Sequence, residues 1–143
     1  MRNQQHQAIR PHRSRAETRT GVFCGGLLAL LTVPVHLVVS EDASELLSAL
    51  LIAAIAAVYV GFAIADGRRR TIALQAAVCL AFVVAAAALY RAAPMALPVL
   101  YVLHGLWDLL HHRTTLPMPR WYVPLCLVYD LATACALWAI WLS

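Results

Sequence analysis

Five long apolar runs constrain this chain more than any other feature of its sequence. A run of roughly 18 or more residues with few charges is long enough to cross a bilayer as an α-helix. Hydrophobic residues make up 62% of the chain and charged residues 13%, whereas soluble domains average about 45–50% and about 25%. The sequence therefore predicts an all-α fold, a polytopic transmembrane helix bundle surrounded by the lipid bilayer. The runs span residues 21–40, 46–65, 71–90, 95–112 and 121–143.

The residues that flank the runs predict the domain organisation and the orientation. Residues 1–20 contain five arginines and no apolar periodicity, which indicates a disordered basic cytoplasmic tail before a helical domain at 21–143. Ten of the 11 arginines lie in this tail or in the turns at 66–70 and 111–120, and only Arg91 lies on the other side. Because cytoplasmic loops are enriched in basic residues, we expect the N-terminus inside and the C-terminus outside. A chain whose termini lie on opposite sides of the membrane crosses it an odd number of times, and five helices satisfy this condition.

The remaining composition bears on location and on partners. The chain contains no lysine and is rich in alanine, which is typical of a GC-rich bacterial genome, so we expect a bacterial inner membrane protein. No A-x-A site ends the first run, which favours an uncleaved first helix. The net charge of +4 does not indicate a nucleic-acid partner, since the arginines cluster at segment ends, where they set orientation and meet anionic lipid.

The spacing of alanines predicts where the helices pack most closely. In the second run, Ala53 and Ala57 lie four residues apart, and residues 85–88 of the third run are all alanine. Small residues at such spacing let two helices approach closely in lipid. We therefore expect close helix packing along both stretches.

A small set of ionisable residues lies inside the predicted spans. A charged side chain near the bilayer centre costs roughly 2.5–3.5 kcal/mol on insertion scales, so such residues are usually retained for function. The same penalty drives them towards the bundle interior and towards one another. They are His36, His104, Asp108 and Asp130, with Asp66, His111 and His112 at the inner ends of their segments.

The fourth run contains the pattern H-x-x-x-D-x-x-H-H. At about 100° per residue, His104, Asp108 and His111 fall within one narrow arc of a helix, with His112 at its edge. Asp130 in the fifth run lies at nearly the same predicted depth as His104, because the two segments are antiparallel neighbours. We therefore expect a polar site in the inner half of the bundle, provided that the faces of these two segments meet.

Imidazole and carboxylate groups together suit a divalent metal, namely zinc, iron or manganese. Ligands one helical turn apart are a known way to bind such an ion. The rise between His104 and His111 is roughly 10 Å, which is too long for both to bind one ion easily. Two alternative metal centres are therefore possible. The deeper centre would use His104, Asp108 and Asp130. The shallower centre would use Asp108, His111 and His112, with Asp66 as a further candidate.

The leading functional hypothesis is a small membrane-embedded metalloprotein, an enzyme acting on a lipid or isoprenoid substrate. In such an enzyme His104, Asp108 and Asp130 would hold a metal that activates water or oxygen. Asp108 and Asp130 are the candidate catalytic carboxylates, and Asp108 would also serve as general base. The alkyl part of the substrate would lie between the alanine-rich helices.

Two other functional classes remain open. Intramembrane histidine and aspartate are common in proton relays, so a transporter or proton-conducting subunit is the second hypothesis. Five helices are few for a transporter, so this hypothesis requires a homodimer or a partner subunit. The third is a structural subunit, in which the ionisable groups only form hydrogen bonds between helices. Each such bond contributes about 0.6 kcal/mol to stability. Paired haem ligation by His36 and His104 is disfavoured, because their predicted depths differ.

The fourth and fifth runs resemble an uncharacterised family of small bacterial membrane proteins. Members of that family carry an H-x-x-W-D-x-x-H-H block, followed by an aspartate in the last helix. Here the block reads HGLWDLLHH, from His104 to His112, with Trp107 and Asp108 in the matching places and Asp130 as the later aspartate. The family has no established activity, so the resemblance supports the residue set and implies no reaction. The histidine boxes of fatty-acid desaturases contain more histidines, spread over several segments, which puts a desaturase in doubt.

Overall fold

The apolar runs form helices in this computed structural model, which describes residues 15–111 and 116–143. Within those ranges every regular element is helical, so the predicted all-α bundle is confirmed. Four of the described helices are long and apolar enough to cross a membrane, which indicates a multi-pass membrane protein. The elements are α1 (Arg15–Val38), α2 (Glu41–Asp66), α3 (Arg69–Ala92), the 3-10 helix η1 (Pro94–Ala96), α4 (Leu97–His111) and α5 (Tyr122–Trp141).

The helix α4 is shorter than the fourth apolar run. It has 15 residues, which at 1.5 Å per residue gives about 22 Å, less than the roughly 30 Å of a bilayer core. Pro98 has no backbone N–H to donate to the carbonyl of Pro94, and the Leu97 N–H makes that bond instead, which closes a 3-10 turn. The run therefore begins as η1 and continues as a short inner helix.

Two helices begin five or six residues earlier than their apolar runs. The helix α1 starts at Arg15, so the last six residues of the segment expected as a tail are helical, and residues 1–14 lie outside the described ranges. Glu41 and Asp42, which follow the first run, lie in the first turn of α2. Ser40 is the N-cap of this helix, and its side chain accepts a hydrogen bond from the Ala43 N–H. Acidic side chains suit this position because a helix N-terminus carries partial positive charge.

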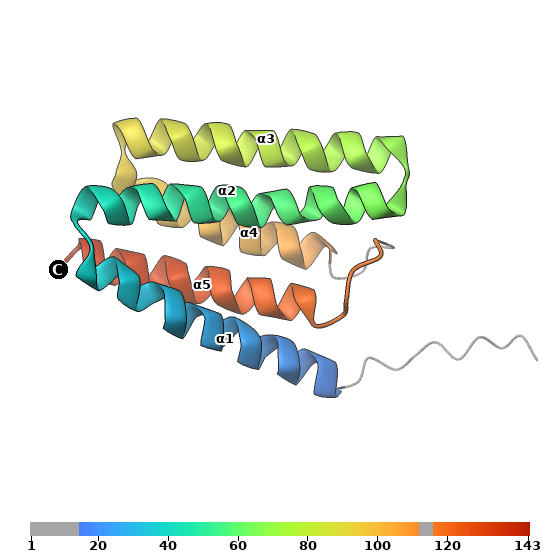
Figure 1. The fold of residues 1–143 in the computed structure, drawn as a ribbon, viewed down its shortest axis with the longest axis horizontal. Helices are drawn as coiled ribbons and strands as arrows, with labels where there is room; N and C mark the ends of the chain where they lie inside the picture. The colour runs from blue at the N-terminus through green and yellow to red at the C-terminus, as the bar shows by residue number, and fades with distance from the viewer. Residues whose placement is uncertain (1–14, 112–115) are drawn as a thin grey trace, which may run out of the picture.

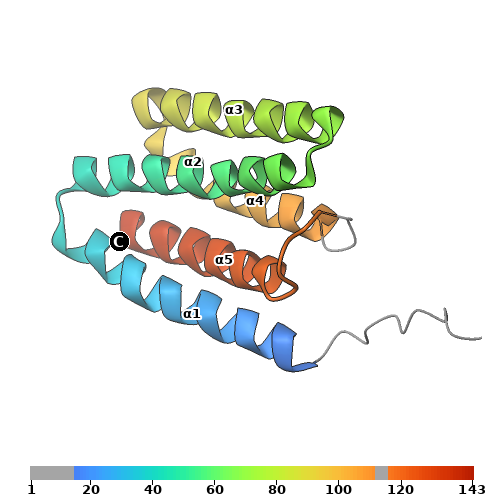
Figure 2. The same cartoon turned by 45° about the vertical axis from the view of Figure 1, so that its right-hand side comes forward.

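The helices lie side by side in the order α3, α2, α4, α5, α1 (Figure 1; Figure 2). The closest packing is between α1 and α5, between α2 and α3, and between α4 and α5. Successive helices run in opposite directions, and α1 begins at the end of the bundle opposite to the one where α5 finishes (Figure 1). The two ends of the helical part thus lie at opposite ends of the bundle, as an odd number of crossings requires. The short α4 packs against α2, α3 and α5 on one side, and its other side carries exposed leucines.

The contact between α1 and α5 depends on two glycines. A Cβ on Gly21 would lie 2.3 Å from the backbone oxygen of Trp121, and a Cβ on Gly25 would lie 2.3 Å from that of Leu125. Gly21, Gly25 and Ala29 are all buried and spaced by four residues, so they form one small-residue face on α1. Sequence reasoning placed this kind of packing elsewhere, at Ala53 and Ala57.

A polar layer joins four helices at the end of the bundle where α1 meets α2. The His36 Nδ1 atom of α1 lies 2.8 Å from the Ser44 Oγ atom of α2, and the indole N–H of Trp141 on α5 donates to the same oxygen at 3.1 Å. Tyr101 of α4 donates to the backbone oxygen of Ser48 at 2.8 Å. His36 is therefore a partner of Ser44, and its place in this layer agrees with the expectation that it does not pair with His104.

Candidate metal centre

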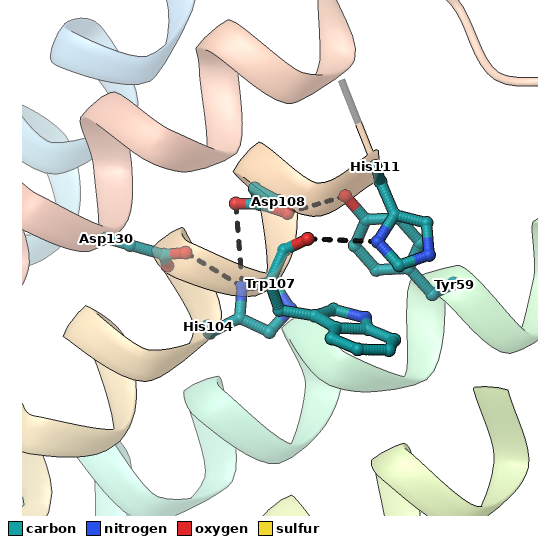
Figure 3. Close-up of polar contacts among 6 residues, drawn as sticks. All are labelled: Tyr59, His104, Trp107, Asp108, His111 and Asp130. Carbon is teal, nitrogen blue, oxygen red and sulfur yellow. Dashed lines mark hydrogen bonds and ion pairs between the residues drawn. The ribbon is translucent and has the colours of Figure 1, made fainter. Parts of the chain in front are cut away.

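Three of the predicted site residues meet in the interior of the bundle. His104 and Asp108 lie one turn apart on α4, Asp130 faces them from α5, and all three side chains have 0% exposure (Figure 3). The His104 Nδ1 atom is 2.8 Å from Asp130 Oδ2 and 3.6 Å from Asp108 Oδ2. This is the deeper of the two centres that the sequence left open.

Local packing between α4 and α5 brings Asp130 next to His104. Gly105 is buried on the side of α4 that faces α5, and a Cβ there would lie 3.3 Å from the Leu127 Cδ1 atom and 3.8 Å from the Asp130 Cβ atom. A larger residue would press on the α5 side chains beside the cluster. The glycine that follows His104 therefore lets the two helices approach closely at the level of the site.

A third helix contributes a hydrogen bond to the cluster. The hydroxyl of Tyr59, on α2, donates to Asp108 Oδ1 at 2.6 Å, and the Tyr59 side chain is buried (Figure 3). Its ring lies beside two imidazoles, with centroid distances of 5.9 Å to His104 and 4.6 Å to His111. The Asp108 carboxylate is thus held between helices α2 and α5, with one oxygen facing Tyr59 and the other facing His104.

The cluster holds more acidic than basic groups. Two carboxyl groups surround one imidazole, so two ionised carboxylates would leave an uncompensated negative charge even beside a protonated His104. An unpaired charge in an apolar interior costs several kcal/mol after relaxation. Shared protons or a bound cation must therefore offset the negative charge of Asp108 and Asp130.

The atoms of this cluster fit a metal ion. One ligand atom from each of His104, Asp108 and Asp130 can be chosen so that all three lie within 4.8 Å of one another. Tetrahedral coordination at roughly 2.0–2.1 Å would separate neighbouring ligand atoms by about 3.4 Å, which small side-chain rotations would reach. Asp108 Oδ2, Asp130 Oδ1 and His104 Nε2 are buried and have no hydrogen-bond partner among the described residues. Buried polar atoms in that state usually indicate a bound water or ion.

Two residues of the shallower centre, His111 and Asp66, have other partners. The His111 Nε2 atom lies 2.7 Å from the Gln75 Nε2 atom, so the amide donates to the ring, and the His111 Nδ1–H then donates to the Trp107 carbonyl at 2.9 Å (Figure 3). Both ring nitrogens of His111 thus have protein partners. Asp66 forms an ion pair with Arg68 at the end of α2. His112 lies outside the described residues.

Two contributors to this region were missed by sequence reasoning. Gln75 lies in the third apolar run, which has few polar residues, and it is buried against α4. Tyr59, in the second apolar run, was not among the predicted site residues. The sequence signal for Gln75 is a lone amide inside an apolar run, because such a group needs a hydrogen-bond partner when it is buried.

Comparisons with known proteins add no family, relative or related structure to this geometry. No protein-family model matches the chain, and no curated protein or solved structure matches it either. The resemblance of residues 104–112 to the H-x-x-W-D-x-x-H-H family stays a prediction. What the structure shows is a multi-pass helical bundle with a buried His–Asp–Asp cluster that can hold a metal ion.

Proposed function

We propose that this chain is an intramembrane metalloenzyme acting on a lipid-like substrate, with one divalent metal ion bound by His104, Asp108 and Asp130. The observation that carries the proposal is the convergence of these three donors, from two helices, at a point with no solvent exposure. Side chains this polar are expensive inside an apolar bundle and need a compensating partner.

The donor set favours particular ions. One imidazole and two carboxylates suit zinc, iron or manganese better than soft, thiolate-preferring ions. Three protein ligands are typical of catalytic zinc sites, which keep a further position for water or substrate. A metal held in this way would polarise a substrate carbonyl or lower the pKa of a bound water.

Each residue has a distinct role in this proposal. His104 and Asp108 would bind the ion from one face of α4, and Asp130 would bind it from α5. Asp108 would bind through its Oδ2 atom, which is buried and has no hydrogen-bond partner in the described part of the chain.

The surroundings of the cluster favour a lipid-like substrate. The outer side of α4 presents Leu103, Leu106 and Leu110, which are 48%, 53% and 68% exposed. These leucines lie within two turns of His104 along α4, on the face turned away from His104 and Asp108, and would face the hydrocarbon of a bilayer. A substrate with an alkyl chain can reach this part of the protein through the membrane, whereas a water-soluble substrate would have to cross apolar packing.

The enzyme proposal is tested by lipid turnover in proteoliposomes. Wild-type protein loaded with zinc, iron or manganese is expected to convert a component of a mixed polar-lipid extract, as seen by mass spectrometry of the lipids. Asp108→Asn keeps the shape of the side chain and removes the charge of a proposed metal ligand, so turnover should fall sharply together with the bound metal. The matched control is His36→Gln, which changes a buried histidine far from the cluster and should retain turnover.

Unchanged lipids with fully metal-loaded wild type, across all three metals, would contradict the enzyme proposal. A proton relay is the alternative, and the direct 2.8 Å contact between His104 and Asp130 is the observation that favours it. In the same vesicles, proton flux that Asp130→Asn abolishes without any change in metal content would support that alternative.

A further inference from the structure

The Asp108 carboxylate is held asymmetrically. Tyr59 donates to its Oδ1 atom at 2.6 Å, whereas its Oδ2 atom faces the His104 ring at 3.6 Å and has no hydrogen-bond partner within the described ranges. The two oxygens therefore have different environments, one of them facing a donor on α2 and the other facing the candidate metal position (Figure 3).

This asymmetry affects how a carboxylate can bind an ion. A free carboxylate can use one oxygen or both, and it changes between the two modes by a small rotation. A phenol hydroxyl on Oδ1 stabilises the orientation in which only Oδ2 points at the metal position. It also withholds Oδ1 from the ion, because a hydrogen bond to a charged acceptor is worth about 1.5–3 kcal/mol.

We propose that Tyr59 is a positioning residue that holds Asp108 as a one-oxygen ligand and so keeps a coordination position open for substrate. This inference rests on the proposed metal site and adds to it a residue from a third helix. Carboxylates and histidines that ligate metals are usually held by such outer hydrogen bonds, whose loss weakens metal binding about 10- to 100-fold.

The Tyr59 ring has a packing role that must be kept apart from the role of its hydroxyl. The ring contacts Phe62 and Tyr122 as well as His111, with centroid distances of 6.3, 6.0 and 4.6 Å. Tyr59→Phe retains that ring and removes only the donor, so it separates the two roles. The chain also offers a matched control in Tyr101, which is equally buried and donates to the Ser48 backbone oxygen, away from the cluster.

The experiment titrates Co²⁺ into metal-free wild type, Tyr59→Phe and Tyr101→Phe, and records affinity and visible absorption. Four-coordinate Co²⁺ absorbs much more strongly than six-coordinate Co²⁺, so the spectrum reports how many ligands the ion has. We expect Tyr59→Phe to bind about 10- to 100-fold more weakly and to lose absorption intensity as the second Asp108 oxygen joins the ion. Tyr101→Phe should match wild type in both readings.

The outcomes separate this inference from the proposed function. If wild type binds Co²⁺ and Tyr59→Phe matches it in affinity and spectrum, the positioning role is wrong and the metal site stands. If Tyr101→Phe changes the spectrum as much as Tyr59→Phe does, the effect is general loosening, and the positioning role is again wrong. If folded wild type binds no Co²⁺, the metal site itself is wrong.

Discussion

Replacing Gly25 with alanine is expected to destabilise the bundle by about 1–3 kcal/mol, the usual range for overpacking a close contact. The added Cβ would lie 2.3 Å from the Leu125 carbonyl oxygen, well inside van der Waals contact. The obstacle is backbone, which cannot rotate away as a side chain can. The helices α1 and α5 must therefore separate along the face that Gly21 and Gly25 form, and the double replacement with alanine should be worse than either single one.

The neighbouring glycine gives a matched control for this prediction. Gly26 lies about 100° around α1 from Gly25, and a Cβ there would meet nothing within 4 Å in the described structure. Alanine is a better helix former than glycine, so Gly26→Ala should be neutral or mildly stabilising. Thermal unfolding in detergent, followed by circular dichroism, measures both variants. Equal stability for Gly25→Ala and Gly26→Ala would show that α1 does not pack on α5 in this way.

Removing metal from wild type is expected to lower its stability by a comparable amount. A ligand that binds only the folded state at 100 times its Kd stabilises that state by about 2.7 kcal/mol. Here the ion would also offset the negative charge of Asp108 and Asp130, so its removal leaves the bundle with the cost of burying both carboxyl groups. A chelator should therefore lower the Tm of metal-loaded wild type.

The same experiment distinguishes a specific site from loosely bound metal. His104→Ala should show the same Tm with and without chelator, because it lacks the ligand between the two carboxylates. His36→Gln should respond to chelator as wild type does, since His36 lies in the Ser44 layer. A wild-type Tm that chelator leaves unchanged, in a sample shown to contain metal beforehand, would mean that the ion lies outside the folded core.

Much of the fold and part of the site could be predicted from the sequence. Apolar runs determine helices directly, because a backbone in lipid must satisfy its hydrogen bonds within each segment. The helical period put His104 and Asp108 on one face, and the short connection between the last two runs made Asp130 a neighbour of that face. These predictions needed only local geometry and the cost of burying charge.

The rest depended on contacts between distant segments. The pairing of α1 with α5 joins the first and last helices. Gly21 and Gly25 have the G-x-x-x-G spacing that favours close packing, but the spacing does not show which helix packs against them. The hydrogen bond of Tyr59 to Asp108 spans 49 residues. Whether His111 faces a metal or an amide depends on where α3 places Gln75, which the sequence does not reveal.

Bound-metal analysis of the purified protein tests the central claim most directly. The protein would be purified in mild detergent without added metal, and its zinc, iron and manganese would be measured by elemental mass spectrometry beside His104→Ala, Asp130→Ala and His36→Gln. The account predicts close to one ion per chain in wild type and His36→Gln, and loss of that ion in both other variants. Well-folded wild type that holds none of these metals, even after reconstitution with each, would contradict the account.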